Sequence, residues 1–230
     1  EIILALPGDT KEAHFRSNYE IVDTGISLLR NYQFMMLPGT EAASRTSRKE
    51  HGLVTRFRIK PMNFGDYGLL SENFVSAEIE EICIGSKTMS YMDYRECRAL
   101  DLVVEIFNNN GIFLELVEFL ARAGVSRSNF LREVHIRAVG ENDVISGLFD
   151  AFRTEEEKNL WEDEEALAAF FQQPSVMGRY LDGEFGTNEI YKYRALAVFS
   201  HMQELHDIAF GAARSLLRAC GSTDDTFIYL

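Results

Sequence analysis

The chain has few of the residues from which covalent or metal-bound frameworks are built. Its 230 residues include only three cysteines and four prolines. The cysteines, Cys83, Cys97 and Cys220, are widely spaced, and no Cys-x-x-Cys pair indicates a zinc ribbon or a cluster-binding loop. Scattered, unpaired cysteines are typical of a reducing compartment, so we expect a cytoplasmic protein.

Basic residues and long apolar runs are also scarce. The 23 Lys and Arg residues face 36 Asp and Glu residues, which gives a net charge of −13. Because binding to nucleic acid needs a positive face, we expect no nucleic-acid partner. No apolar run reaches the roughly 18 residues of a membrane helix, so no membrane partner is expected either. The 46% hydrophobic and 26% charged residues are typical of a globular protein.

Motifs for metal binding and common catalytic chemistry are missing too. His201 and His206 are five residues apart and diverge by about 140° on a helix, so they predict no shared metal. The acidic runs 155–157 and 162–165 lack the calcium-loop pattern and are read as solvated helix faces. No Gly-Lys-Ser/Thr phosphate loop or Gly-x-Ser-x-Gly elbow occurs. We therefore predict no metal ligand and no catalytic residue in this chain.

The first 40 residues predict a βαβ unit. A short apolar run at 2–6 and a second at 32–37 each end in Leu-Pro-Gly, and continuous apolar runs of this length are typical of buried parallel strands. Between them Asp9 and Thr10 are good N-caps of a helix that ends near Asp23, with Gly25 as its stop. Both Pro-Gly turns lie at the carboxyl edge of the strands, where α/β folds bind ligands.

The remainder predicts a second strand pair and then helices. We expect a short helix at 41–52, strands at 54–60 and 74–84, and a loop at 63–73. Helices are expected at 90–107, 112–123, 128–138, 142–153, 155–172 and 190–219, with a polar loop at 178–187 and a short strand at 226–230. The expected class is therefore α+β: an α/β start followed by a mainly α-helical C-terminal domain.

Two segments of the βαβ unit resemble a known family. Residues 1–12, Glu-Ile-Ile-Leu-Ala-Leu-Pro-Gly-Asp-Thr-Lys-Glu, resemble the fifth strand and turn of radical S-adenosylmethionine (SAM) enzymes. Residues 32–43, Tyr-Gln-Phe-Met-Met-Leu-Pro-Gly-Thr-Glu-Ala-Ala, resemble the sixth. Residues 53–113 are similar to the region after the barrel in cobalamin-binding-type members, through Thr-Arg-Phe-Arg at 55–58, Met-Ser-Tyr-Met-Asp-Tyr at 89–94 and Val-Glu-Ile-Phe at 104–107.

The resemblance implies a fold and a domain division. Residues 1–61 would form the last βα units of a partial TIM-type barrel, residues 62–88 a connecting loop and strand, and residues 89–230 a helical C-terminal domain. The sequence also departs from the family. Ala5 replaces its usual Gly, Asp9 replaces its Glu, and the Cys-x3-Cys-x2-Cys loop that holds the iron–sulfur cluster is absent.

These departures predict a C-terminal fragment that is inactive alone. The parent would be an oxidoreductase or transferase with a [4Fe–4S] cluster and SAM, and possible use of cobalamin stays open. This part would help bind SAM and substrate, and its partner would be the missing N-terminal part. The alternative is an independent helical module that binds a ligand or a protein. A cut barrel also exposes strand edges, so we expect self-association through residues 1–60.

The same resemblance names candidate cofactor contacts. Apolar contacts to the SAM adenine would come from Leu4, Leu6, Met35 and Met36, although core packing is the alternative for each. Glu41 and Arg45, just past the second Pro-Gly turn, could contact substrate or lie on a solvated helix face. Arg56, Arg58 and Lys60 alternate on one strand, where they could gather an anionic group or simply face solvent.

Overall fold

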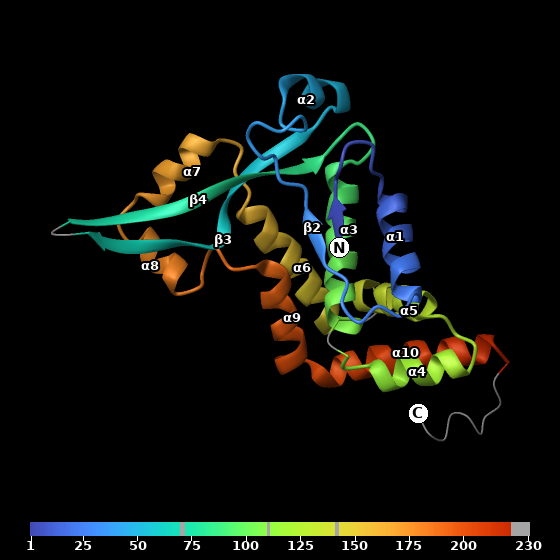
Figure 1. The fold of residues 1–230 in the computed structure, drawn as a ribbon. Coiled ribbons are helices and arrows are strands. Elements are labelled where there is room, and N and C mark those ends of the chain that lie inside the picture. The colour runs from blue at the N-terminus through green and yellow to red at the C-terminus, as the bar shows by residue number, and fades with distance from the viewer. Residues whose placement is uncertain (70–71, 110, 141–142, 222–230) are drawn as a thin grey trace.

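Two small sheets and ten helices make up the part of the chain that the structure, a computed structural model, describes: residues 1–69, 72–109, 111–140 and 143–221. Helices predominate, and the sheets are confined to the first 85 residues (Figure 1). The mixed α and β class expected from the sequence is confirmed at this level. The strand expected at 226–230 lies outside the described residues.

The first sheet is parallel. Strand β1 (Ile2–Leu4) pairs with β2 (Asn31–Gln33), and helix α1 (Lys11–Asp23) crosses between them. Thr10 caps this helix by accepting a hydrogen bond from the backbone N–H of Ala13. The predicted βαβ unit is therefore confirmed, with strands shorter than the apolar runs.

The two strands end in the same turn. The Asp9 N–H donates to the Leu6 carbonyl at 2.9 Å, and the Thr40 N–H donates to the Leu37 carbonyl at 3.2 Å. Gly8 has φ +84°, which an L side chain rarely adopts, and Gly39 in the second turn has φ +82°. The repeated Leu-Pro-Gly sequence thus forms the same backbone turn twice.

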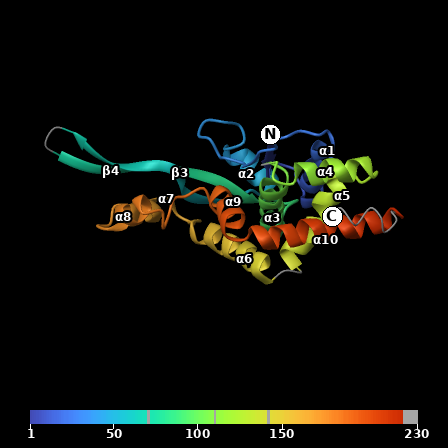
Figure 2. The ribbon, with the colours of Figure 1, turned by 90° about the horizontal axis from the view of Figure 1, so that it is seen from below.

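A long antiparallel hairpin forms the second sheet. Helix α2 (Arg45–His51) precedes strand β3 (Val54–Leu69), which pairs with β4 (Glu72–Gly85). The residues after β2 join the two sheets, because the Met36 N–H donates to Glu81 O at 2.8 Å and the Cys83 N–H donates to Phe34 O at 2.9 Å. Figure 2 shows the hairpin extending beyond the main body of helices.

The loop expected at 63–73 is wrong for residues 63–69 and 72–73, because these belong to the strands of the hairpin. Gly65, Asp66 and Gly68 suggest a loop by composition, yet all three are paired with β4. Aromatic contacts hold the strands there: Tyr67 stacks on Phe74 across the pair, with ring centroids 5.7 Å apart. The boundary expected at residue 61 falls within β3.

Eight helices follow the hairpin. Helix α3 lies at the centre, and the predicted capping box at its start is present between Ser90 and Asp93. The bounds are α3 (Tyr91–Phe107), α4 (Leu114–Arg122), α5 (Arg127–Gly140), α6 (Asp143–Lys158), α7 (Glu164–Phe171), α8 (Val176–Leu181), α9 (Glu189–Ser200) and α10 (Met202–Ala219).

Several predicted boundaries differ from the structure. Helix α6 runs through Thr154, whose hydroxyl donates to the Asp150 carbonyl within the helix instead of starting a new one. Asp163 is the actual cap of the next helix, since its carboxylate accepts from the Ala166 N–H. The single helix expected at 190–219 breaks at His201, and α8 occupies part of the polar loop expected at 178–187.

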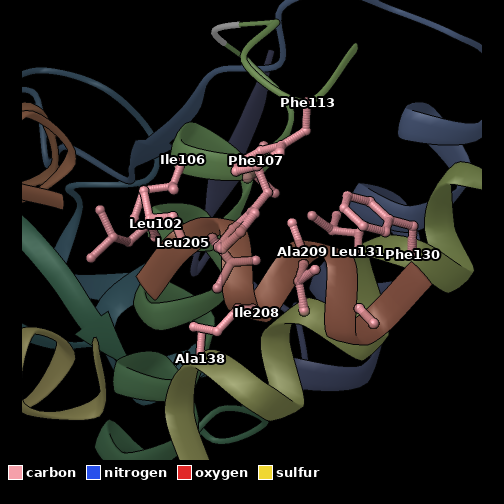
Figure 3. Close-up of a cluster of buried hydrophobic side chains, with 14 of the residues drawn as sticks. Leu102, Ile106, Phe107, Phe113, Phe130, Leu131, Ala138, Leu205, Ile208 and Ala209 are labelled. Atoms are coloured by element: carbon pink, nitrogen blue, oxygen red, sulfur yellow. The ribbon is translucent and has the colours of Figure 1, made fainter. Parts of the chain in front are cut away.

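The main core lies among the helices. Apolar side chains of α1, α3, α5, α6, α9 and α10 pack into one cluster, part of which Figure 3 shows around Leu102, Phe107 and Leu205. A smaller cluster joins the first sheet to α3, and a third joins the hairpin to α7 and α8. None of the described helices combines the length and apolarity needed to cross a bilayer.

Candidate functional site

A cavity of about 750 Å³ lies between the first sheet, the base of the hairpin, α3 and the start of α9. Residues of β1 and β2 line it, including all three residues of β2. Ile3 and Tyr32, directly opposite each other in the register, line the cavity and are each 44% exposed. Leu4 faces the other way and is buried against α3. One face of the sheet is therefore packed and the other is open to the cavity.

The four predicted cofactor contacts do not come together in this cavity. Met35 lines it. Leu4 and Met36 are buried in the cluster that joins the sheet to α3. Leu6 lies in the turn beyond β1 and is 40% exposed.

The predicted polar candidates also separate. Arg58 and Lys60 line the cavity, whereas Arg56 on the same strand pairs with Glu162 at 2.9 Å. Glu41 and Arg45 lie beside α2, in hollows of their own. Of the three alternating basic residues, Arg58 and Lys60 thus face the cavity and Arg56 does not.

The floor of the cavity contains a buried charged array. Arg98 of α3 donates to Glu156 of α6 at 2.8 and 2.7 Å and to Asp101 at 3.2 Å. The other Asp101 oxygen lies 2.8 Å from Nε2 of His14, so the array links α1, α3 and α6. Pairing of this kind offsets the large cost of burying charge.

The field inside the array sets the pKa values of its members. Burial by itself lowers the pKa of Arg98, but the carboxylates of Glu156 and Asp101 outweigh burial and hold that pKa above its usual value. Burial also opposes charge on His14, and Asp101 again reverses the effect, so the pKa of His14 is raised. Burial raises the pKa of Glu156 although Arg98 acts against it. Each shift follows from the geometry of the ion pairs.

Two further polar pairs border the cavity. The Gln33 amide donates to the Tyr94 hydroxyl at 2.6 Å, which fixes β2 against α3. Arg58 donates to Glu80 at 2.6 Å across the hairpin. Burial of Tyr94 raises the pKa of its phenol. These pairs hold the walls of the cavity in place.

The cysteines do not fit an iron–sulfur cluster. Cys83 and Cys97 are buried, and burial raises the pKa of both thiols. Cys220 is exposed at the end of α10, remote from them in the fold. Cluster ligation needs several thiolates gathered at one place. Across the described ranges, no three His, Cys, Asp or Glu side chains are grouped to hold a metal ion.

Several residues of the cavity escape sequence reasoning. Arg98 and Glu105 look like ordinary polar positions of a helix, yet both are buried on the cavity floor. Tyr32 could have been found from the strand alternation, since it stands opposite in phase to Gln33. Glu189 could have been found from Asn188, a good N-cap that marks the start of α9.

The comparisons with known proteins add no family. No model of a known protein family matches the chain, and a search of curated proteins finds no match. Function is therefore argued from the motifs and the geometry.

Proposed function

We propose that the chain is the C-terminal portion of a radical SAM iron–sulfur enzyme, an oxidoreductase or transferase, in which it helps bind SAM and substrate. One observation carries the proposal. Ala5 stands where the family motif has glycine, and its φ is +67°, in the left-handed region that glycine favours. The backbone here has the left-handed conformation in which glycine is favoured, although the side chain differs.

The first sheet supports a partial barrel. Its strands are parallel, its crossover is a helix, and only one face is packed by helices. Parallel sheets are typically covered on both faces. Among the described residues β1 pairs with β2 alone, so its outer edge is available to further strands of a barrel. The cavity would then lie on the inner face of that barrel.

The residues present fit an organic ligand better than a metal cluster. Ile3, Tyr32 and Met35 offer apolar and aromatic contact to an adenosyl group, and Arg58 and Lys60, each paired with a carboxylate, lie at the same wall. The bound SAM and cluster supply the 5′-deoxyadenosyl radical in such enzymes. This chain's own residues would position ligands and exclude water, and the thiols that hold the cluster would come from another part of the parent.

The experiment that tests the proposal is sequencing of the source gene upstream of the Glu1 codon. We expect the reading frame to continue and to encode Cys-x3-Cys-x2-Cys. The full-length protein, prepared anaerobically, would then be assayed for SAM cleavage. A start codon immediately before Glu1, with no upstream cluster loop, would contradict the proposal and favour the independent ligand-binding or interaction module.

A further inference from the structure

The cavity floor carries charged side chains that are almost completely buried. Glu80, Arg98, Glu105 and Glu189 line the cavity with 7%, 4%, 6% and 4% of their surface exposed. Glu80 is paired with Arg58 at 2.6 Å. Arg98 is paired with Glu156 and Asp101, and Glu105 lies 3.4 Å from Arg194.

Glu189 differs from these residues because it has no ion pair among the described residues. Its Oε1 accepts a hydrogen bond from the neutral Asn159 amide at 2.6 Å, and no other hydrogen bond to its carboxylate is found in the described part of the chain. Glu189 is the first residue of α9, where the partial positive charge of the helix end is favourable. That charge is only about half an elementary charge, so it does not neutralise a carboxylate.

Two other carboxylates lie in the surroundings of Glu189. Behind it lies the buried Glu156, whose pKa is raised by burial first and also by the charge of Glu189. Glu105 borders the same cavity. The guanidinium groups of Arg58 and Arg98 are already occupied by carboxylates. The lining carries both signs of charge, but its Arg58, Lys60 and Arg98 are each paired with a carboxylate, which leaves the buried charge of Glu189 uncompensated.

We propose that this cavity binds a small organic molecule carrying an ammonium group, with the ammonium beside Oε2 of Glu189 and the body of the molecule against Tyr32, Tyr191 and Met35. An ammonium supplies the donors and the positive charge that Glu189 lacks. Aromatic rings at the wall favour the cation further. The assignment of this molecule as the substrate rests on the proposed function. The positive charge of the molecule is inferred from the cavity alone.

Basic side chains at the rim of the cavity favour an anionic ligand, but less strongly than Glu189 favours a cation. Lys60 is paired with Glu78 at 3.0 Å, and both side chains are partly exposed. Arg30 is exposed, so water screens its charge. An anionic ligand is therefore the competing outcome of the test.

The test is a titration of the whole chain with three probes of one shape: benzylamine, benzyl alcohol and benzoate. The methionine methyl groups would be labelled with ¹³C, and the Met35 signal, assigned with a Met35→Leu variant, reports occupancy of the cavity. We expect benzylamine to shift this signal saturably and the other two probes to bind at least tenfold more weakly.

A matched pair of variants locates the ammonium. Glu189→Gln removes the charge and keeps the shape, and we expect it to weaken benzylamine at least tenfold. Glu164→Gln makes the same change at the first residue of α7, outside the cavity, and should leave the affinity unchanged. If Glu189→Gln does not fold, the three probes on the wild-type chain still decide the charge of the ligand.

Three results would overturn the proposal: no saturable shift with benzylamine, equal or tighter binding of benzoate, or full affinity in the Glu189→Gln variant. Displacement of benzylamine by SAM at similar concentration would assign the ammonium to the cofactor and overturn the substrate assignment. The upstream gene sequence is independent of these measurements, so failure of the ligand proposal and failure of the family proposal are distinguishable.

Discussion

Ala5 combines a left-handed backbone with a buried side chain. Its φ is +67°, its exposed surface is 0%, and its N–H donates to Oδ2 of Asp9 at 3.2 Å. A single hydrogen bond to the turn that follows thus helps hold a conformation that costs alanine about 1–2 kcal/mol. The residue type alone gives no sign of this, since alanine is ordinary in a strand; the glycine of the family motif is the only signal.

The effect of an Ala5 substitution on stability should depend more on the left-handed backbone than on the size of the new side chain. Ala5→Gly relieves the left-handed strain but loses a buried methyl group, so we expect the free energy of unfolding to change by less than about 1 kcal/mol. Ala5→Val should lower it by about 2 kcal/mol or more, because β-branched residues rarely adopt positive φ. Urea denaturation of the two variants checks this, and equal stabilities would contradict it.

His135 should make the protein sensitive to acid. Burial, together with the charge of Arg153, lowers the pKa of His135 to about 4, and its ring packs against Phe15. The unfolded chain binds a proton near pH 6.5 and the folded chain does not, so stability from this site is lost as the pH falls from 6.5 to 4.

His135→Gln removes this contribution. The slope of the free energy of unfolding between pH 6.5 and 4 should become shallower by up to about 1.4 kcal/mol per pH unit. Denaturant titrations at several pH values measure the slope, with His206→Gln, an exchange at an exposed histidine, as the control. An unchanged slope in His135→Gln would refute the prediction.

At the scale of elements, the turns and the start of α3 were predictable, whereas the boundaries between α6 and α7 and between α9 and α10 were not. The Leu-Pro-Gly turns and the Ser90 cap act through local hydrogen bonds, which sequence reasoning can follow. The strand pairing of residues 63–69 with β4 depends on Tyr67 and Phe74 meeting across the hairpin. The break at His201 contains no glycine or proline, and it separates α9, which packs on α3 and α6, from α10, which packs chiefly on α5.

The capping box of α3 should contribute measurably to stability. The Ser90 hydroxyl oxygen accepts from the Asp93 N–H at 3.1 Å, and the Asp93 carboxylate accepts from the Ser90 N–H at 3.1 Å. Ser90→Ala should lower the free energy of unfolding by about 1 kcal/mol. Thermal denaturation measures the loss, and Ser90→Thr, which keeps the oxygen, should recover most of it. An equal loss in both variants would argue against the cap.

The candidate site was predictable only in part, and the strand alternation pointed to Arg58 and Lys60, which line the cavity. The motif suggested strand residues, and Met35 does line the cavity, but Leu4 and Met36 point into the packing against α3. The cavity itself arises because α9, over 150 residues from β2, lies beside it. Contacts at such a separation depend on tertiary packing and leave no local pattern in the sequence.

The uncovered sheet face has consequences for the whole molecule. Ile3 and Tyr32 are exposed beside the free edge of β1. Such edges and apolar faces favour association, so we propose that the chain self-associates through residues 1–60. Light scattering at high concentration should detect dimers or larger species, and Ile3→Lys should return them to monomers. A clean monomer of the wild-type chain would count against this.

The His14–Asp101–Arg98–Glu156 array also constrains how this protein can diverge. It connects three helices, and loss of Arg98 or Asp101, each of which pairs with two other members, leaves a buried charge uncompensated, at a cost of about 3–5 kcal/mol. A loss of this size from a single replacement is a large part of the free energy of unfolding of a typical domain. Lineages of this protein should therefore change these four positions in concert, through paired or stepwise compensated exchanges, and keep them fixed otherwise.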